Sequence, residues 1–122
     1  LIINRVEAAA LFERPIDTID DAETALENCT LPCPTIIITL GSDGLVFHNS
    51  DNQPRHIPAV NIEPISSHGA GDAFVGALSS HLAVGRPVDE SLTYASAAAA
   101  LHVSTPVEQR FSVGPTDVEK LL

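Results

Sequence analysis

The run of β-branched residues at Thr35–Thr39 constrains the fold of this chain most strongly. Its sequence is TIIIT, and it stands between Pro34 and Gly41. Three consecutive isoleucines make both faces of an extended strand apolar, so we expect a strand that is buried on both sides. Such strands are typical of parallel sheets whose faces are covered by helices. The run therefore predicts an α/β protein.

The segments on either side of this run fit the same class. Apolar spacing, turn residues and Gly-Pro punctuation divide them into short strands and amphipathic helices. We expect strands at 1–4, 34–41, 44–49 and 54–60, the last two forming a hairpin, and helices at 5–13, 17–29, 73–85, 88–103 and 114–122. Strands followed by helices in this order indicate a layered α/β architecture.

The spacing of apolar residues predicts which face of each helix is buried, and capping patterns predict where the helices begin. The expected buried faces carry Val6, Ala9 and Ala10 in the first helix, Ile19, Ala22 and Leu26 in the second, and Phe74, Leu78 and Leu82 in the third. Two capping boxes are expected at helix starts, Asn4 with Glu7 and Thr116 with Glu119.

The charge balance excludes some classes of partner. The chain has 6 Lys and Arg against 16 Asp and Glu, a net charge of −10. Binding to nucleic acid or to an anionic membrane requires clustered basic residues. No apolar stretch approaches the roughly 20 residues of a membrane span, and no signal peptide is evident. We therefore expect a cytoplasmic protein with Cys29 and Cys33 as reduced thiols, a local disulfide being the alternative.

The start of the chain predicts that it is part of a longer protein. The sequence contains no methionine and begins with Leu1 inside an apolar run that is typical of a strand. Few strands are expected, so the sheet is thin. We therefore expect residues 1–122 to form a single partial domain, whose open sheet edge and apolar surface favour a homo-oligomer or a self-associating fragment.

The tetrapeptide Gly69-Ala70-Gly71-Asp72 has the pattern of an anion site at the start of a helix. Glycines let a backbone approach an anion closely, and the first turn of a helix presents unsatisfied N–H groups at its positive end. Asp72 could accept a proton from a substrate hydroxyl there. A plain helix start with a favourable acid in its first turn is the alternative.

Two further segments follow strands, where ligands bind in open α/β sheets. One is TLGSDG at residues 39–44, with Gly41 and Gly44 just past the isoleucine run. The other is NRVE, in which Asn4 and Glu7 could organise a metal-bound water network. An ordinary turn and an ordinary helix cap explain the same residues equally well.

Taken together, the three segments resemble the ribokinase-like carbohydrate kinases, the PfkB family. Asn4 and Glu7 match its N-x-x-E segment, and residues 39–44 match T-x-G-x-x-G. Residues 69–74, GAGDAF, match the core of its signature, and YASAAAAL resembles its alanine-rich helix. The resemblance covers the C-terminal part of a family member. It implies the nucleotide-binding part of a three-layer α/β/α, Rossmann-like sheet.

The resemblance implies ATP-dependent phosphorylation of a hydroxyl on a sugar or nucleoside, with Mg²⁺ as cofactor. Asp72 would be the general base. The remaining implied site residues are Gly69, Ala70 and Gly71 as the anion hole, Asn4 and Glu7 around magnesium and the triphosphate (Glu7 through water), Thr39, Gly41 and Gly44 along the nucleotide, and Ser96 and Ala99 near the adenine.

The chain departs from the family pattern just before the signature. Ser66-Ser67 replaces the usual Asp-Thr, His68 stands where threonine is common, and residues 105–115 lack a frequent Gly-Ala run. These segments help bind a monovalent cation in several members, so potassium activation is in doubt here. A vitamin-type kinase of the same superfamily and a non-catalytic nucleotide- or sugar-binding module are the alternatives. We expect the isolated chain to be inactive.

Overall fold

The isoleucine run forms the strand β2 (Thr35–Thr39), and Ile36, Ile37 and Ile38 are all buried, as predicted. The computed structural model describes residues 1–50 and 53–122, which divide into two compact units, Leu1–Ala59 and Val60–Leu122. Whether residues 1–122 form a single partial domain stays a prediction.

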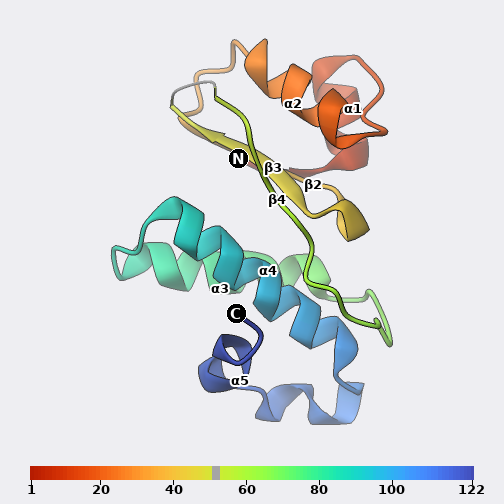
Figure 1. Ribbon diagram of the computed structural model, residues 1–122, viewed down its shortest axis with the longest axis vertical. Helices are drawn as coiled ribbons and strands as arrows, with labels where there is room; N and C mark the ends of the chain where they lie inside the picture. The colour runs from red at the N-terminus through yellow and green to blue at the C-terminus, as the bar shows by residue number, and fades with distance from the viewer. Residues whose placement is uncertain (51–52) are drawn as a thin grey trace. The chain divides into compact units, whose positions relative to one another are not determined.

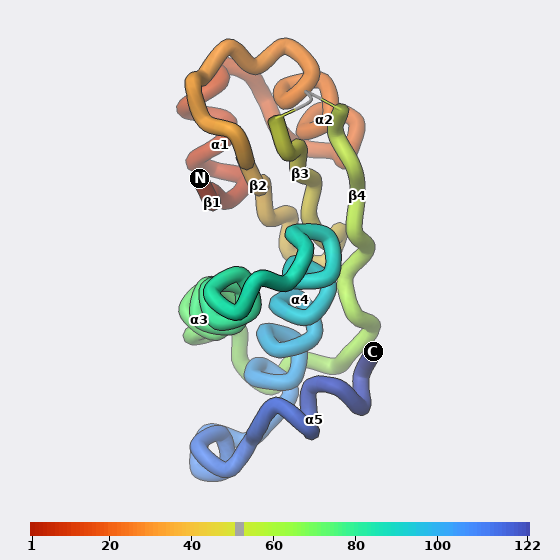
Figure 2. The backbone as a smooth tube through the Cα atoms, turned by 90° about the vertical axis from the view of Figure 1, so that its left-hand side faces the viewer, coloured from red at the N-terminus to blue at the C-terminus, as the bar shows by residue number. Residues whose placement is uncertain are grey.

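The first unit is built on a mixed sheet (Figure 1), and its strand order is β1-β2-β3-β4 (Figure 2). The other strands are β1 (Ile2–Asn4), β3 (Leu45–Asn49) and β4 (Arg55–Ile57). β1 pairs with β2 in parallel, whereas β2–β3 and β3–β4 are antiparallel. The predicted hairpin is therefore confirmed in its two strands, and residues 51 and 52 of its connection lie outside the described residues.

The helices α1 (Arg5–Phe12) and α2 (Ile19–Glu27) pack on this sheet. Their shared core contains Ile3, Ala8, Ile16, Ala22, Ala25, Leu26, Cys29, Ile36, Ile38, Leu40 and Val46. The face predicted for α2 is confirmed, because Ala22 and Leu26 are buried and Ile19 packs against them.

The face predicted for α1 is wrong at Val6 and Ala10, which are exposed, and right at Ala9, which packs on the core. Val6 is 77% exposed, whereas Ala8 is completely buried and Phe12 packs on the core. The helix begins directly after β1, so its rotation is set by the Asn4 cap and by Arg5, whose side chain bonds to neighbouring loops. With Arg5 turned inward, residues 8 and 12 follow it at helical spacing and Val6 faces solvent.

The second unit is helical. It contains α3 (Ala70–Ala83), α4 (Val88–Ser104), the 3₁₀ turn η2 (Val107–Ser112) and α5 (Pro115–Glu119). α4 packs against both α3 and α5 (Figure 2). Tyr94, Ala97 and Val118 form a core cluster between these helices.

Two predictions at helix ends in this unit need correction. The buried face of α3 includes Phe74 and Leu78, but Leu82 is 43% exposed because the helix ends one residue later. At α5 the cap is Gly114, whose N–H donates to Asp117 Oδ2 at 2.9 Å, and not Thr116 with Glu119. Pro115 occupies the first helical position, where its fixed φ starts the helix two residues early.

Both cysteines are free thiols. Within the described part of the chain, none of the helices combines the length and apolarity that a membrane crossing needs.

Candidate functional site

The carboxyl ends of β1 and β2 bring two of the predicted site residues side by side. Asn4 and Thr39 end these parallel strands and are register partners. Thr39 Oγ1 donates to the carbonyl of Ile3 at 3.5 Å. Because both chains leave the sheet at the same edge, the segments that follow them, α1 and the loop after β2, begin next to each other.

Asn4 and Glu7 form the predicted capping box. The Asn4 N–H donates to Glu7 Oε1 at 3.0 Å, and the Glu7 N–H donates to Asn4 Oδ1 at 2.9 Å. This box leaves the side-chain amide of Asn4 and the second oxygen of Glu7 unused, and both residues are exposed. A cap and a water-mediated ligand are therefore compatible roles for the same pair.

The loop after β2 is a tight turn that requires both of its glycines. The Leu40 N–H donates to the carbonyl of Gly44 at 2.8 Å and closes the turn. Gly44 has φ +88°, and a Cβ placed on it would lie 2.0 Å from the carbonyl oxygen of Ile57. Gly41 has φ +61°, but a Cβ there would meet nothing within 4 Å. Gly44 is thus fixed by packing, whereas Gly41 faces open space.

Arg5 holds this loop against the start of α1, a role that sequence reasoning missed. Its Nη2 donates to the carbonyl of Leu40 at 3.0 Å and to Asp43 Oδ2 at 2.9 Å, and its Nη1 donates to the carbonyl of Asp17 at 2.5 Å. Arg5 lies inside the N-R-V-E segment and is one of only 6 Lys and Arg residues in the chain. Its position within a predicted site segment was therefore the signal in the sequence that could have revealed this role.

The predicted anion hole lies at the start of α3. Gly69 caps this 14-residue helix with φ +83°, and no side chain caps the helix there. The Ala70 N–H donates weakly to the carbonyl of Ser67 at 3.3 Å, whereas the N–H groups of Gly69, Gly71 and Asp72 have no acceptor among residues 1–50 and 53–122. Asp72 is exposed in the first turn, and a Cβ on Gly71 would meet nothing within 4 Å. Three N–H donors that are free within the described residues thus share one open helix terminus with a carboxylate.

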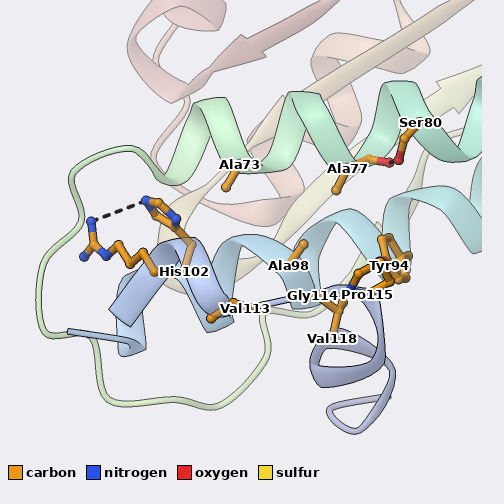
Figure 3. Close-up of a pocket in the computed structure, with 11 residues that line it drawn as sticks. Ala73, Ala77, Ser80, Tyr94, Ala98, His102, Val113, Gly114, Pro115 and Val118 are labelled. Atoms are coloured by element: carbon orange, nitrogen blue, oxygen red, sulfur yellow. Dashed lines mark hydrogen bonds between the residues drawn. The ribbon is translucent and has the colours of Figure 1, made fainter. Parts of the chain in front are cut away.

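A cavity of about 230 Å³ lies between α3, α4 and the segment around α5 (Figure 3). Ala73 and Ala77 line it from α3, and Tyr94, Ala98 and His102 line it from α4 (Figure 3). The remaining lining residues are Ser80, Arg110, Val113, Gly114, Pro115 and Val118. The α4 residues that line it recur every fourth position, so they share one face of the helix.

Ser96 and Ala99 do not line this cavity. Both are half-buried on α4. Their predicted place near an adenine therefore stays a prediction. Burial, with a smaller contribution from the charge of Glu119, raises the pKa of Tyr94 above its ordinary value of 10.0.

The predicted residues thus form two groups, one in each unit. Asn4, Glu7, Thr39, Gly41 and Gly44 lie together in Leu1–Ala59, and Gly69–Asp72 lie with α4 in Val60–Leu122. No three His, Cys, Asp or Glu side chains come close enough to hold a metal ion directly, as far as the chain is described.

Comparison with known proteins shows which family has this architecture. Residues 1–112 match the model of the pfkB family carbohydrate kinases. The chain is 30% identical over 112 residues to a ribokinase of Schizosaccharomyces pombe, covering 84% of this chain and 34% of the relative. It is 34% identical over 88 residues to a 2-dehydro-3-deoxygalactonokinase of Haloferax volcanii, covering 72% of this chain and 27% of the relative.

A solved structure agrees with the family match. Arabidopsis thaliana ribokinase, complexed with ribose and ATP, superposes with a TM-score of 0.85 at 26% identity, over 99% of this chain and 39% of that chain. The chain therefore has a ribokinase-like α/β fold, and it spans about a third of the length of the relatives it matches. With a family model that covers all but its last ten residues, this chain belongs to the pfkB family of carbohydrate kinases.

Proposed function

We propose that the protein carrying this chain transfers the γ-phosphoryl group of ATP to a hydroxyl of a sugar or sugar-like substrate. One observation carries this proposal more than any other. At the start of α3, the N–H groups of Gly69, Gly71 and Asp72 lack acceptors within the described part of the chain, and the carboxylate of Asp72 is exposed beside them. This is the donor-and-base arrangement that phosphoryl transfer requires.

In the proposed reaction Asp72 is the general base. As the substrate hydroxyl attacks the γ-phosphorus, its proton passes to the Asp72 carboxylate and a new O–P bond forms. The bond from the γ-phosphorus to the bridging oxygen breaks, and ADP leaves with that oxygen. The free amides of Gly69 and Gly71 stabilise negative charge on the phosphate oxygens, helped by the positive end of α3. The amide of Ala70 joins them once its weak bond to the carbonyl of Ser67 is released.

The residues of the first unit are assigned to the nucleotide. Gly41 faces open space, so a nucleotide could approach its backbone closely, and the carbonyl of Gly44 accepts the bond that closes the loop in which it lies. Thr39, at the end of β2, is assigned to the same nucleotide. Ser96 and Ala99 are assigned to the neighbourhood of the adenine on the strength of the family resemblance. These assignments remain proposals.

Magnesium fits the residues at the start of α1. The oxygen of Glu7 that the capping box leaves unused is the type of ligand that holds magnesium-bound water. Asn4 and Glu7 would organise that water, and magnesium would neutralise charge on the triphosphate when bound. The structure holds these two side chains in place by their mutual backbone bonds.

The test is the substitution Asp72→Asn in the complete natural gene product that carries this chain. We expect kcat to fall on the order of 100-fold or more, because a general base typically contributes that much, while ATP affinity changes little. Substrate-dependent ADP release across a panel of sugars and nucleosides measures kcat, and titration calorimetry measures ATP binding.

Asp89→Asn is the matched control, because Asp89 is an exposed aspartate in the first turn of the neighbouring helix α4. It removes the same charge from a similar position and is expected to leave kcat unchanged. Near-normal turnover in Asp72→Asn would exclude Asp72 as the base. ATP binding without turnover in the unsubstituted protein would favour a binding module, and phosphorylation of hydroxymethylpyrimidine or pyridoxal instead of a sugar would favour the vitamin-type branch.

A further inference from the structure

The guanidinium of Arg110 joins three segments of the second unit. Its Nε donates to the carbonyl of Thr105 at 3.0 Å, and its Nη1 donates to the carbonyl of His68 at 3.2 Å. The same Nη1 lies 3.3 Å from His102 Nε2 (Figure 3, dashed line). Because a guanidinium carries only donors, the contacting nitrogen of His102 is the acceptor and its proton sits on Nδ1.

These contacts are unlike those of an ordinary surface arginine. All three acceptors are neutral, and none is a carboxylate. Arg110 is half-buried, whereas Arg86 is exposed and pairs with Glu90 at 3.2 Å. Two backbone carbonyls and an imidazole nitrogen thus converge on one fixed positive charge, which the planar fork of an arginine can serve simultaneously.

The carbonyl of His68 belongs to the same peptide unit as the N–H of Gly69. In a trans peptide the C=O and the N–H point in opposite directions, so fixing one fixes the other. The N–H of Gly69 is one of the donors at the start of α3 that have no acceptor among the described residues. A charge-assisted bond to the carbonyl also polarises the peptide and strengthens its N–H as a donor.

His102 fixes the same peptide from the side. A Cβ placed on Gly69 would lie 2.7 Å from His102 Nε2, so the imidazole packs directly against this glycine. Arg110 therefore contacts the peptide through its oxygen, and the imidazole that Arg110 holds occupies the space beside Gly69 where a Cβ would lie.

We infer that Arg110 is a positioning residue that orients the His68–Gly69 peptide and thereby aims the Gly69 N–H into the anion hole. The inference rests on the proposed function, since the hole has a purpose only if a phosphoryl group is transferred there. Arg110 touches neither substrate in this role and acts through the peptide that it holds.

The test compares Arg110→Ala and Arg110→Lys with the control Arg86→Ala in the complete natural gene product. We expect both Arg110 variants to lose on the order of 10- to 100-fold in kcat with sugar, because a misplaced donor fails at the transition state, while the KM for ATP shifts by less. Arg110→Lys keeps the charge but cannot bridge several acceptors with one planar group. It therefore keeps the result interpretable if Arg110→Ala does not fold. Arg86→Ala is expected to match the unsubstituted protein.

Hydrogen exchange separates this inference from the proposed function. In the protein without ligands, the amides of residues 66–72 are expected to exchange about tenfold faster in both Arg110 variants and at the unchanged rate in Arg86→Ala. Unchanged exchange, or a kcat within twofold of the unsubstituted protein, would overturn the role of Arg110. Faster exchange in a protein with no phosphoryl transfer would keep the role of Arg110 in the loop and overturn the proposed function instead.

Discussion

Gly44 and Gly41 lie three residues apart in the same loop and have left-handed φ values, yet the structure predicts very different costs for a methyl group at each. For Gly44→Ala, the new Cβ would lie 2.0 Å from the carbonyl oxygen of Ile57 and 2.7 Å from the N of Ala59. Both obstacles are backbone atoms, which cannot turn aside as a flexible side chain does. Ile57 ends β4 and is the register partner of Leu45, so the β3–β4 ladder must open to make room.

The magnitude follows from two contributions. A left-handed φ costs an L-residue about 1–2 kcal/mol. Overpacking against the backbone and loosening of the ladder add about 1–3 kcal/mol for Gly44→Ala. For Gly41→Ala only the first contribution applies, because nothing lies within 4 Å of the new methyl group. We therefore expect losses in the free energy of unfolding of about 2–5 kcal/mol for Gly44→Ala and about 1–2 kcal/mol for Gly41→Ala.

Urea unfolding followed by circular dichroism measures both losses, provided that the slope with urea is unchanged. The entropy that alanine removes from the unfolded chain is the same in both variants and cancels in the difference. ATP titration gives the complementary result, because the methyl group of Gly41→Ala would project into the space proposed for the nucleotide. Equal destabilisation of the two variants would refute this reasoning, since it would mean that φ alone decides the cost.

Two titrations test the electrostatics of the fold. Hydrogen bonds from the backbone N–H groups of Asp17 and Thr18 lower the pKa of Asp21 below its ordinary 3.8, so its stabilising contribution is present above that pH and lost as pH falls through the lowered pKa. The Tm of Asp21→Asn should therefore lie below that of the unsubstituted protein at pH 7, and the two Tm values should converge in strong acid. A Tm difference that does not change with pH would contradict the lowered pKa of Asp21. Burial raises the pKa of Tyr94 above 10.0, so the neutral phenol stabilises the fold at neutral pH and that contribution is lost as pH rises through the raised pKa. The absorbance titration of the protein minus that of Tyr94→Phe should have its midpoint above pH 10, and a midpoint at or below 10 would refute burial as the cause.

Local patterns were sufficient for much of the fold. The isoleucine run predicted a fully buried strand, and the Asn4–Glu7 pair predicted a cap that forms as expected. Gly85 marked the end of α3, where it adopts φ +82°. These features depend on neighbours within a few residues, because hydrogen-bond geometry and allowed φ values act over that range. The sequence also placed Asn4 and Thr39 at the ends of two apolar runs, and the structure makes them register partners; their role in a site stays a prediction.

The rotation of helices and the partners of charged side chains were not predictable in this way. Val6 has the spacing of a core residue, but the bonds of Arg5 to Leu40 and Asp43, 35 and 38 residues away, turn it to solvent. No local sequence pattern predicts the role of Arg110, because its partner at the predicted anion hole, the carbonyl of His68, lies 42 residues earlier.

By itself the sequence therefore determined which strands and helices form and which residues, Gly69–Asp72 above all, carry the proposed chemistry. Only the tertiary structure decided which donors at the start of α3 remain free and what orients them. The reason is physical: secondary structure arises from short-range geometry, whereas the direction of the Gly69 peptide depends on side chains that folding brings from distant parts of the chain.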